Sequence, residues 1–324
     1  MREKVNQYDI IGDVHGRWDK LEPLLAKLGY EHDGLCHVHP EGRQAIFLGD
    51  LIDPKGNVPN GVREVLFAVK AMCDAEHAQC ILGNHELHLV AYHTPDGKGG
   101  FLKSRYGSDK KMHIGTHASL AEYPGELEDV WLPWIKSLPF FIEFPEFRVV
   151  HACWQDEHIS FLEGKSLADD AFLNACVDKS DMSGAYNAVE VSLKGVELPM
   201  PEGHHFFDKQ GKKRKHFRAC WWDRQPSDLR ASHLVFPPNP DIPPIEVSAE
   251  EVAKLPGYAR NDKPVFFGHF YKSGGAARQP ESSDVYCLDF SAANGGFLAA
   301  YRWDQASPLN EAHLVSHQQS QVNH

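Results

Sequence analysis

Five short, mostly apolar runs along the chain each end beside a residue that can bind a metal ion. Apolar runs bounded by turn residues predict buried strands, and near-continuous apolar strands are typical of a sheet covered on both faces. The pattern therefore predicts an α/β protein with these strands in its interior. The five runs are Tyr8–Ile11, Ala45–Leu48, Cys80–Leu82, Arg148–Val150 and Val265–Phe267.

Apolar residues recur at helical spacing after the first two runs. One set begins at Trp18 and reaches Leu28, where Gly29 provides a stop, and the other extends from Val62 to Met72. The alternation of strands and helices predicts a βαβαβ unit with its polar residues on the strand-to-helix loops.

The remaining sequence is organised around this unit. We expect residues 1–324 to form a single domain, with a helical segment at 87–140 flanking the site. Proline and charged residues increase between the last two runs, and no catalytic motif occurs there. Residues 155–263 are therefore predicted to be an insertion that acts as a lid or specificity segment.

The C-terminal part of the chain returns to strand-like sequence. Apolar runs at 285–290 and 296–303 are separated by Asn294 and Gly295, a dipeptide typical of tight hairpin turns. The pattern predicts a hairpin here and a second sheet packed on the first.

A glycine followed by a potential metal ligand recurs at the strand ends. Four of the ends read Gly-Asp, Gly-Asp, Gly-Asn and Gly-His. Sheets of this class bind ligands at the carboxyl ends of their strands, so these residues are expected to converge in one crevice. Imidazole and carboxylate donors together suit Mn, Fe, Co or Zn, and six donors suit two metals that share a bridging carboxylate. The six candidate ligands are Asp13, His15, Asp50, Asn84, His151 and His269.

A two-metal centre of this kind indicates hydrolysis at phosphorus. Paired metals clamp the attacking and leaving oxygens and generate hydroxide at neutral pH, so no protein nucleophile is needed. The leaving oxygen still requires a proton, and His85, next to Asn84, is the predicted general acid. Asp53, three residues after Asp50, is the predicted carboxylate that orients His85.

The order of these motifs resembles that of a known family. GDxHG at 12–16, GDxxD at 49–53 and GNHE at 83–86, followed by two strand-end histidines, is similar to the calcineurin-like metallophosphoesterases and their phosphoprotein phosphatase branch. The resemblance covers residues 7–155 and 264–303. It implies an α/β fold of two mixed β-sheets packed as a sandwich and flanked by helices, with a dinuclear metal site at the strand ends.

The resemblance also implies a role for each matching residue. The first metal would be bound by Asp13, His15 and Asp50, and the second by Asp50, Asn84, His151 and His269, with Asp50 as the bridge. His85 would then be the general acid and Asp53 its partner, in agreement with their spacing.

One departure from the family pattern affects the substrate. The family usually has an arginine directly after the second aspartate of GDxxD, and this chain has Pro54, which has no side-chain donor. Lys55, Arg17 and Arg105 are the candidate substrate-binding cations that could replace it.

Composition narrows the class of protein further. The 324 residues carry a net charge of -12, which argues against a nucleic-acid binder. Seven cysteines without a CxxC pair indicate neither a disulfide framework nor a zinc finger. The first strand begins within ten residues of Met1 and no window approaches 18 apolar residues, so a cytoplasmic protein without a membrane segment is expected.

Three functions are compatible with these features. The first is a phosphatase that uses two Mn, Fe or Zn ions and a metal-bridging hydroxide to hydrolyse phosphomonoesters, either small ones or phosphoproteins modified on Tyr or Ser/Thr. The alternative is a hydrolase of dinucleoside polyphosphates or phosphodiesters with the same centre. The third is a metal-stabilised scaffold that has lost catalysis, against which the complete set of ligands and the acid argue.

Overall fold

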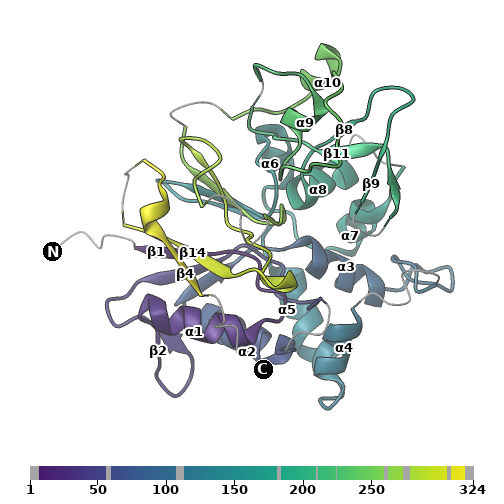
Figure 1. Ribbon diagram of the computed structural model, residues 1–324. Helices are drawn as coiled ribbons and strands as arrows, with labels where there is room; N and C mark the ends of the chain where they lie inside the picture. Colours follow the sequence, from purple (N-terminus) through teal and green to yellow (C-terminus); the bar gives the residue numbers. More distant parts are fainter. Residues whose placement is uncertain are drawn as a thin grey trace, which may run out of the picture.

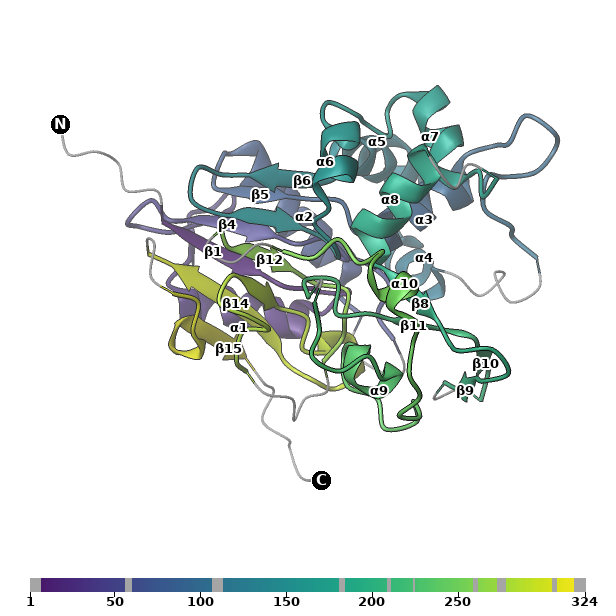
Figure 2. The ribbon, with the colours of Figure 1, turned by 90° about the horizontal axis from the view of Figure 1, so that it is seen from above.

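The computed structural model describes residues 7–55, 60–106, 113–180, 184–208, 211–223, 225–258, 262–272, 278–304 and 308–317. Two mixed sheets pack face to face at the centre of the molecule (Figures 1 and 2). All five predicted strands are present in them. They are β1 (Tyr8–Ile11), β4 (Gln44–Phe47), β5 (Ala78–Cys80), β7 (Arg148–Val150) and β12 (Val265–Phe267).

The first sheet has the strand order β15-β14-β1-β4-β5. Strands β1, β4 and β5 are parallel, as a βαβαβ unit requires, with Tyr8 opposite Gln44 and Ala45 opposite Ala78. Strand β14 (Leu298–Trp303) adds to β1 in the antiparallel sense, and β15 (Leu314–His317) adds to β14 in the same way. The carboxyl ends of β1, β4 and β5 therefore meet at one edge of the sheet.

The second sheet has the order β13-β12-β7-β6. Strands β13 (Val285–Cys287), β12 and β7 are parallel, and β6 (Phe141–Glu143) pairs with β7 in the antiparallel sense. Side chains alternate along these strands, so Phe266 faces the first sheet while Val265 and Phe267 face away from it. Apolar residues from both sheets fill the space between them, as a sandwich requires.

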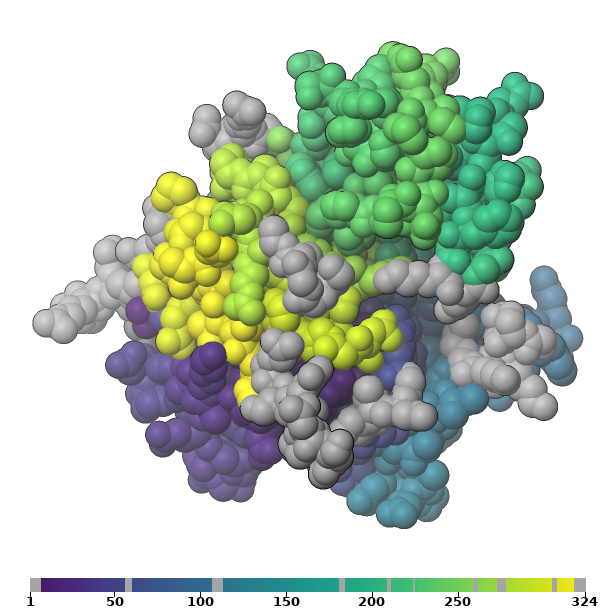
Figure 3. Space-filling view, in the orientation of Figure 1, coloured from purple at the N-terminus to yellow at the C-terminus, as the bar shows by residue number. Residues whose placement is uncertain are grey.

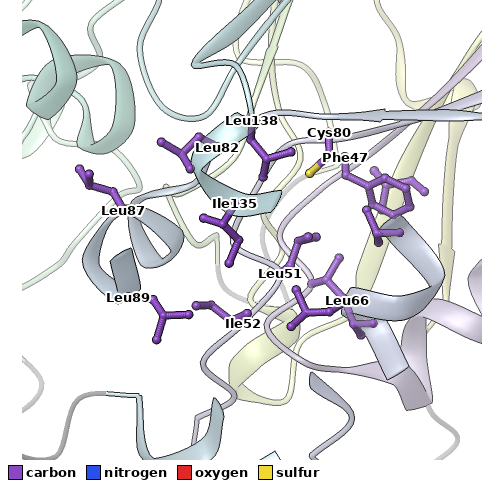
Figure 4. Close-up of a cluster of buried hydrophobic side chains, with 14 of the residues drawn as sticks. Phe47, Leu51, Ile52, Leu66, Cys80, Leu82, Leu87, Leu89, Ile135 and Leu138 are labelled. Atoms are coloured by element: carbon purple, nitrogen blue, oxygen red, sulfur yellow. The ribbon is translucent and has the colours of Figure 1, made fainter. Parts of the chain in front are cut away.

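Helices cover the outer face of the first sheet (Figure 1). Helices α1 (Trp18–Leu28) and α2 (Val62–Asp74) occupy the predicted positions, and Gly29 ends α1 in the left-handed conformation. Leu51, Ile52, Leu66, Leu82 and Ile135 pack together beside the strand ends (Figure 4). The loops that follow the strands are thus anchored by the same core that holds the helices.

The helical flanking segment and several short elements surround the first sheet. The segment contains α3 (Asn84–His93), α4 (Ile114–Leu120), η2 (Leu127–Trp131) and α5 (Leu132–Ser137). Two short strands, β2 (Glu31–His32) and β3 (His37–Val38), pair after α1, and η4 (Glu311–His313) precedes β15.

The predicted C-terminal hairpin is wrong. Strand β13 belongs to the second sheet and β14 to the first, so the chain crosses between the sheets at this point. Asn294 and Gly295 close the short 3₁₀ helix η3 (Ala292–Asn294), in which the amides of Asn294 and Gly296 both donate to Ser291 O at 2.9 Å. A turn dipeptide flanked by apolar runs therefore serves here as a helix end, because each run is paired with a strand from elsewhere in the chain.

The described part of residues 155–263 lies beside the second sheet (Figure 3). Its first part packs on the core of the first sheet through residues such as Phe172, Leu173 and Val189, and its later part has a buried cluster of its own that includes Leu198, Phe217 and Val252. Its elements are α6 (Asp156–Leu162), α7 (Asp170–Val177), α8 (Ala185–Lys194), β8 (Glu197–Pro199), β9 (Phe206–Phe207), β10 (Lys213–Arg214), β11 (His216–Arg218), α9 (Ala231–Leu234) and α10 (Ala249–Val252).

Among the described residues, no helix is both long enough and apolar enough to cross a bilayer.

Candidate metal centre

The six candidate ligands converge at one edge of the sandwich. Asp13 and His15 follow β1, Asp50 follows β4, and Asn84 begins α3 after β5. His151 and His269 come from the second sheet, after β7 and β12. A pocket of about 120 Å³ is lined by five of the six, and His151 lies directly behind Asp50 with its Nε2 atom 3.5 Å from Asp50 Oδ1.

Asp50 is at the centre of this arrangement. Its Oδ2 atom lies 3.6 Å from His15 Nε2, and its Oδ1 atom faces His151 Nε2. Two groups of potential ligands, each with atoms within 4.8 Å of one another, share this carboxylate. One group adds His15 and His85 to Asp50, and the other adds His151 and His269. The geometry suits a carboxylate that bridges two ions.

Backbone carbonyls set the orientation of two of the imidazoles. His15 Nδ1 lies 2.9 Å from Ile52 O, and His151 Nδ1 lies 2.7 Å from Leu48 O. Because each carbonyl accepts a hydrogen bond from Nδ1–H, each Nε2 faces the centre, where its deprotonated form can bind a metal. Such carbonyl contacts are the usual support of metal-binding histidines.

Buried polar atoms without partners also fit a metal. Asp13 Oδ1 and His269 Nε2 are both buried and have no hydrogen-bond partner. Asp13, Asp50 and Asp289 are buried carboxyls, and among the described residues none of them pairs with a lysine or arginine within 4.0 Å. A cation would compensate this buried negative charge. The residues present therefore fit two metal ions.

The pKa values of these carboxyls follow from the same crowding. Burial, and then the charge of Asp289, raises the pKa of Asp13, and burial raises the pKa of Asp289 to about 6. Burial also acts to raise the pKa of Asp50, but the imidazoles of His151 and His85 outweigh it and hold that pKa well below its usual value. Asp50 is therefore the carboxyl most firmly kept ionised.

Two of the glycines that precede the ligands allow neighbouring strand ends to touch. A side chain on Gly83 would overlap the Asp50 backbone nitrogen, and one on Gly268 would overlap the Asp13 carboxylate. The Gly-Asn and Gly-His pairs are thus explained by close approach of loops from different strands.

Several residues of the centre hold left-handed backbone conformations that non-glycine residues rarely adopt. The φ angles are 50° for His15, 49° for Asp50, 63° for Asp53 and 61° for His269. Each costs about 1–3 kcal/mol and persists only where its surroundings enforce it. Such strain is concentrated at functional sites.

Glu86 is one residue that enforces this backbone. Its fully buried carboxylate accepts hydrogen bonds from Asp50 N at 2.8 Å, Leu51 N at 2.8 Å and Gly83 N at 3.1 Å. The last residue of the GNHE motif thus holds the loop that carries Asp50. Sequence reasoning assigned it no role, although its place in the motif was a signal.

His85 and Asp53 are in direct contact, as their spacing predicts. His85 Nδ1 lies 2.7 Å from Asp53 Oδ2, and its Nε2 atom points to the centre, 4.0 Å from Asp50 Oδ2. Burial opposes the charged form of His85, but Asp50 and Asp53 outweigh it and raise its pKa. Burial also opposes the charged form of Asp53, and hydrogen bonds from His113 and His85 reverse this and lower its pKa.

The three predicted substrate-binding cations lie in different surroundings in the structure. Lys55 lines the pocket. Arg17 is buried elsewhere, where its guanidinium binds Asp19 at 2.6 and 2.7 Å and the carbonyl of Ala292 at 3.0 Å. Arg105 donates to Tyr92 O and stacks over Phe101, and it does not line the described pocket.

A fourth cation lines the pocket from a distant part of the chain. Arg218, at the end of β11, lies in the pocket wall together with Tyr271. In the sequence Arg218 is the last residue of a basic run that indicates either a solvated loop or attraction of an anionic substrate, and only the folded chain shows that it reaches the pocket. The region containing residues 155–263 thus contributes to the site.

Comparison with known proteins defines the class. The family model described as calcineurin-like phosphoesterase matches residues 8–181, more than half of the chain. The chain belongs to this family, which confirms the predicted fold and makes it a metallophosphoesterase, a hydrolase whose family uses two metal ions.

Two curated relatives carry the same name. The asymmetrical bis(5′-nucleosyl)-tetraphosphatase PrpE of Halalkalibacterium halodurans is 44% identical over 158 residues, which are 47% of this chain and 59% of that protein. PrpE of Geobacillus thermodenitrificans is 31% identical over 166 residues, 48% of this chain and 61% of that protein. The match thus spans about three fifths of the length of these two relatives.

Solved structures to which this chain is similar have low sequence identity and low TM-scores. A putative diadenosine tetraphosphatase is 16% identical with a TM-score of 0.44, over 99% of this chain and 97% of that one. A cold-active protein tyrosine phosphatase is 16% identical with a TM-score of 0.48, over 92% of this chain and 74% of that one.

Proposed function

We propose that this metallophosphoesterase hydrolyses a phosphoanhydride bond in dinucleoside polyphosphates, such as a dinucleoside tetraphosphate. The observation that carries the proposal is the presence of two cations, Lys55 and Arg218, in the wall of the candidate metal pocket. A chain of several phosphates needs more than one cation beside the metals. The names of the two PrpE relatives support the same substrate class.

The two cations are arranged around one aromatic ring. Lys55 Nζ lies 5.8 Å from the centre of the Tyr271 ring, and the Arg218 guanidinium lies 5.6 Å from it. Among the described residues neither cation forms an ion pair within 4.0 Å, so both can bind phosphate oxygens. The planar guanidinium of Arg218 can grip two oxygens at once, which Pro54 cannot do.

The candidate ligands have distinct roles in this proposal. The shared carboxylate of Asp50 would join two sets of ligands, with Asp13 and His15 on one metal and Asn84, His151 and His269 on the other. When bound, such metals act as Lewis acids and provide a water-derived nucleophile at neutral pH.

Proton transfer is the task of His85. Its Nε2 atom faces the centre and donates a proton to the leaving oxygen, while Asp53 holds Nδ1 and stabilises the protonated ring. Lys55 and Arg218 would bind phosphate oxygens and stabilise the negative charge of the polyphosphate as the bond breaks.

Hydrolysis of phosphomonoesters is the second candidate. Sequence analysis placed it first, and the curated relatives favour dinucleoside polyphosphates instead. The small volume of the pocket, about 120 Å³, suits one phosphoryl group and its immediate surroundings and thus keeps the monoester reaction open. Phosphotyrosine, phosphoserine and aryl phosphates would all use the same centre.

Turnover measurements with Mn²⁺-loaded protein test the proposal. We expect kcat/KM for a dinucleoside tetraphosphate to exceed that for phosphotyrosine and phosphoserine peptides by at least about tenfold. His85→Ala should lower turnover by about 10²–10⁴-fold, the usual contribution of a general acid. Asp50→Asn should also lower turnover, because it weakens the carboxylate shared by the two sets of metal ligands. The exposed His204→Ala is the matched control. Higher kcat/KM on the peptides would establish the second candidate instead.

A further inference from the structure

A second, larger cavity lies beside the candidate metal pocket and shares Arg218 with it. Its volume is about 800 Å³, and α6, α8 and β8 supply most of its walls. We propose that it binds the distal nucleoside of the substrate, an inference that rests on the proposed function. Its size is within the range of about 300–1,000 Å³ typical of sites for ligands of this class.

The wall between the two spaces is thin. Gly195 lines the large cavity with a φ of 82°, and a side chain there would overlap the ring of Phe270, which directly follows His269. The Arg218 guanidinium lies 5.8 Å from the centre of the same ring and faces both spaces. A polyphosphate bound at the metals can therefore pass Arg218 and place its far end in the large cavity.

The charges in the large cavity place phosphate at one end of it. Lys194 binds Glu190 at 2.6 Å and Lys254 binds Glu251 at 2.6 Å, so both lysines are already neutralised. Arg218 is then the cation available to phosphate among the described lining residues. The phosphates should lie against Arg218 and the uncharged nucleoside beyond it.

Helix α6 contributes groups to the cavity wall that suit a nucleoside. The Phe161 side chain is 42% exposed, and His158 is half-buried nearby on the same helix. Aromatic rings of this kind stack on bases, at about 1–3 kcal/mol per base. Glu157, on the same helix, also lines the cavity and can accept hydrogen bonds from ribose hydroxyls. Glu197 lies opposite Arg218 in the pairing of β8 with β11 and is therefore on the phosphate side.

Phe161→Ala tests this assignment against turnover of two substrates. For the variant, the ratio of kcat/KM for dinucleoside tetraphosphate to kcat/KM for 4-nitrophenyl phosphate should fall at least about tenfold, through a higher KM for the dinucleotide. Phe207→Ala, which removes an exposed ring from a different surface, is the matched control. Glu157→Gln should lower the ratio in the same direction without removing any packed side chain.

The outcomes separate the two claims. Failure of the wild-type protein to hydrolyse dinucleoside tetraphosphate would refute the proposed function and this inference together. Turnover by the wild type with an unchanged ratio in Phe161→Ala and Glu157→Gln would overturn the cavity assignment alone.

A different observation carries a second inference, because hydrogen bonds converge on Asp53 from three residues. Asp53 Oδ2 accepts from His85 Nδ1 at 2.7 Å and from His113 Nδ1 at 2.6 Å, while Oδ1 accepts from Thr116 Oγ1 at 2.6 Å. Thr116 Oγ1 in turn accepts from Asp53 N at 3.1 Å. We infer that His113 and Thr116 are positioning residues that act on His85 through Asp53.

Their location favours this role over simple packing. His113 and Thr116 are one helical turn apart at the start of α4, so both side chains can face the same carboxylate. The His113 side chain is fully buried, and its φ of 59° shows that the backbone is held against its preference. With both oxygens of Asp53 fixed, the His85 ring has one orientation.

The dependence of turnover on the leaving group tests the second inference. A displaced general acid slows release of poor leaving groups most, so His113→Ala and Thr116→Val should lower turnover of phenyl phosphate about tenfold and of 4-nitrophenyl phosphate less than about threefold. His113→Asn and Thr116→Ser keep a donor at each position and should recover most of the loss.

The results would differ if His113 and Thr116 only stabilised the fold. Equal losses on both substrates, or losses that the conservative variants do not recover, would overturn the inference, as would unchanged turnover in His113→Ala and Thr116→Val. His85→Ala serves as the reference, because it should show the strongest dependence on the leaving group.

Discussion

Replacement of Glu86 by alanine tests how the loop that carries Asp50 is held. The fully buried Glu86 carboxylate accepts three backbone hydrogen bonds, from Asp50, Leu51 and Gly83. Glu86→Ala removes both acceptor oxygens and leaves three backbone amides without another hydrogen-bond partner among the described residues. The perturbation therefore acts on the bridging ligand without touching it.

The expected cost follows from these three contacts. A buried amide that loses its partner costs about 1–3 kcal/mol, so three of them cost about 3–9 kcal/mol. Burial raises the pKa of Glu86 to about 7, so loss of its charge relieves part of this cost. We therefore expect the lower half of the range, about 3–6 kcal/mol. Glu86→Gln retains one acceptor oxygen and should cost about 1–3 kcal/mol.

Urea denaturation in the presence of a chelator measures this difference, because the free energy of unfolding extrapolates linearly with denaturant. Asp74→Ala is the matched control, since its exposed i,i+4 pair with Lys70 should contribute less than about 0.5 kcal/mol. A loss below about 1 kcal/mol in Glu86→Ala, close to that of the control, would refute the role assigned to Glu86.

Three further predictions concern the metals, a ligand loop and pH. Removal of the metals by a chelator should lower the free energy of unfolding by about 3–4 kcal/mol, compared with protein kept at a metal concentration of about 100–1,000 times the dissociation constant. An unchanged melting temperature would contradict this prediction. Gly268→Ala should reduce bound metal per chain, measured by elemental analysis, because its side chain would displace Asp13; full metal content would be incompatible with the proposed ligand set. The lowered pKa of Asp53 means that its ionised form stabilises the fold above about pH 4, and that this stabilisation is lost as pH falls further. In metal-free protein the difference in unfolding free energy between wild type and Asp53→Asn should thus be constant from about pH 7 to 5 and shrink below about pH 4.

The five strands could be predicted from the sequence because each is a short apolar run that ends at a turn. Arg148–Val150 and Val265–Phe267 match their strands residue for residue, and helix α1 begins at Trp18 and ends at Leu28 as its periodicity indicates. Convergence of the ligands follows from this, because parallel strands share a carboxyl edge.

The predicted C-terminal hairpin was wrong because strand pairing is not a local property of the sequence. Asn294 and Gly295 favour a tight turn locally, but strand pairing is decided by which partners the flanking runs find. Strand β14 pairs with β1, at the other end of the chain, and β13 with β12. Local turn chemistry contains no information about these distant partners.

The sequence indicated no role for His113 and Thr116, and Arg218 stood out only as one of a run of basic residues. All three lie close to groups that are distant along the chain, and none belongs to a strand-end motif. Arg17 shows the converse, since its position directly after a motif indicated substrate binding, and the fold instead engages its guanidinium with Asp19 and Ala292.

The sequence by itself determined the fold class, the identity of the candidate metal ligands and the pairing of His85 with Asp53, because strand periodicity and motif spacing are local properties. Only the tertiary structure decided which cations reach the pocket, what holds Asp53 and Asp50 in place, and where a second cavity opens beside the centre. These depend on contacts between segments that are far apart in the chain, and such contacts exist only once the two sheets and residues 155–263 have packed together.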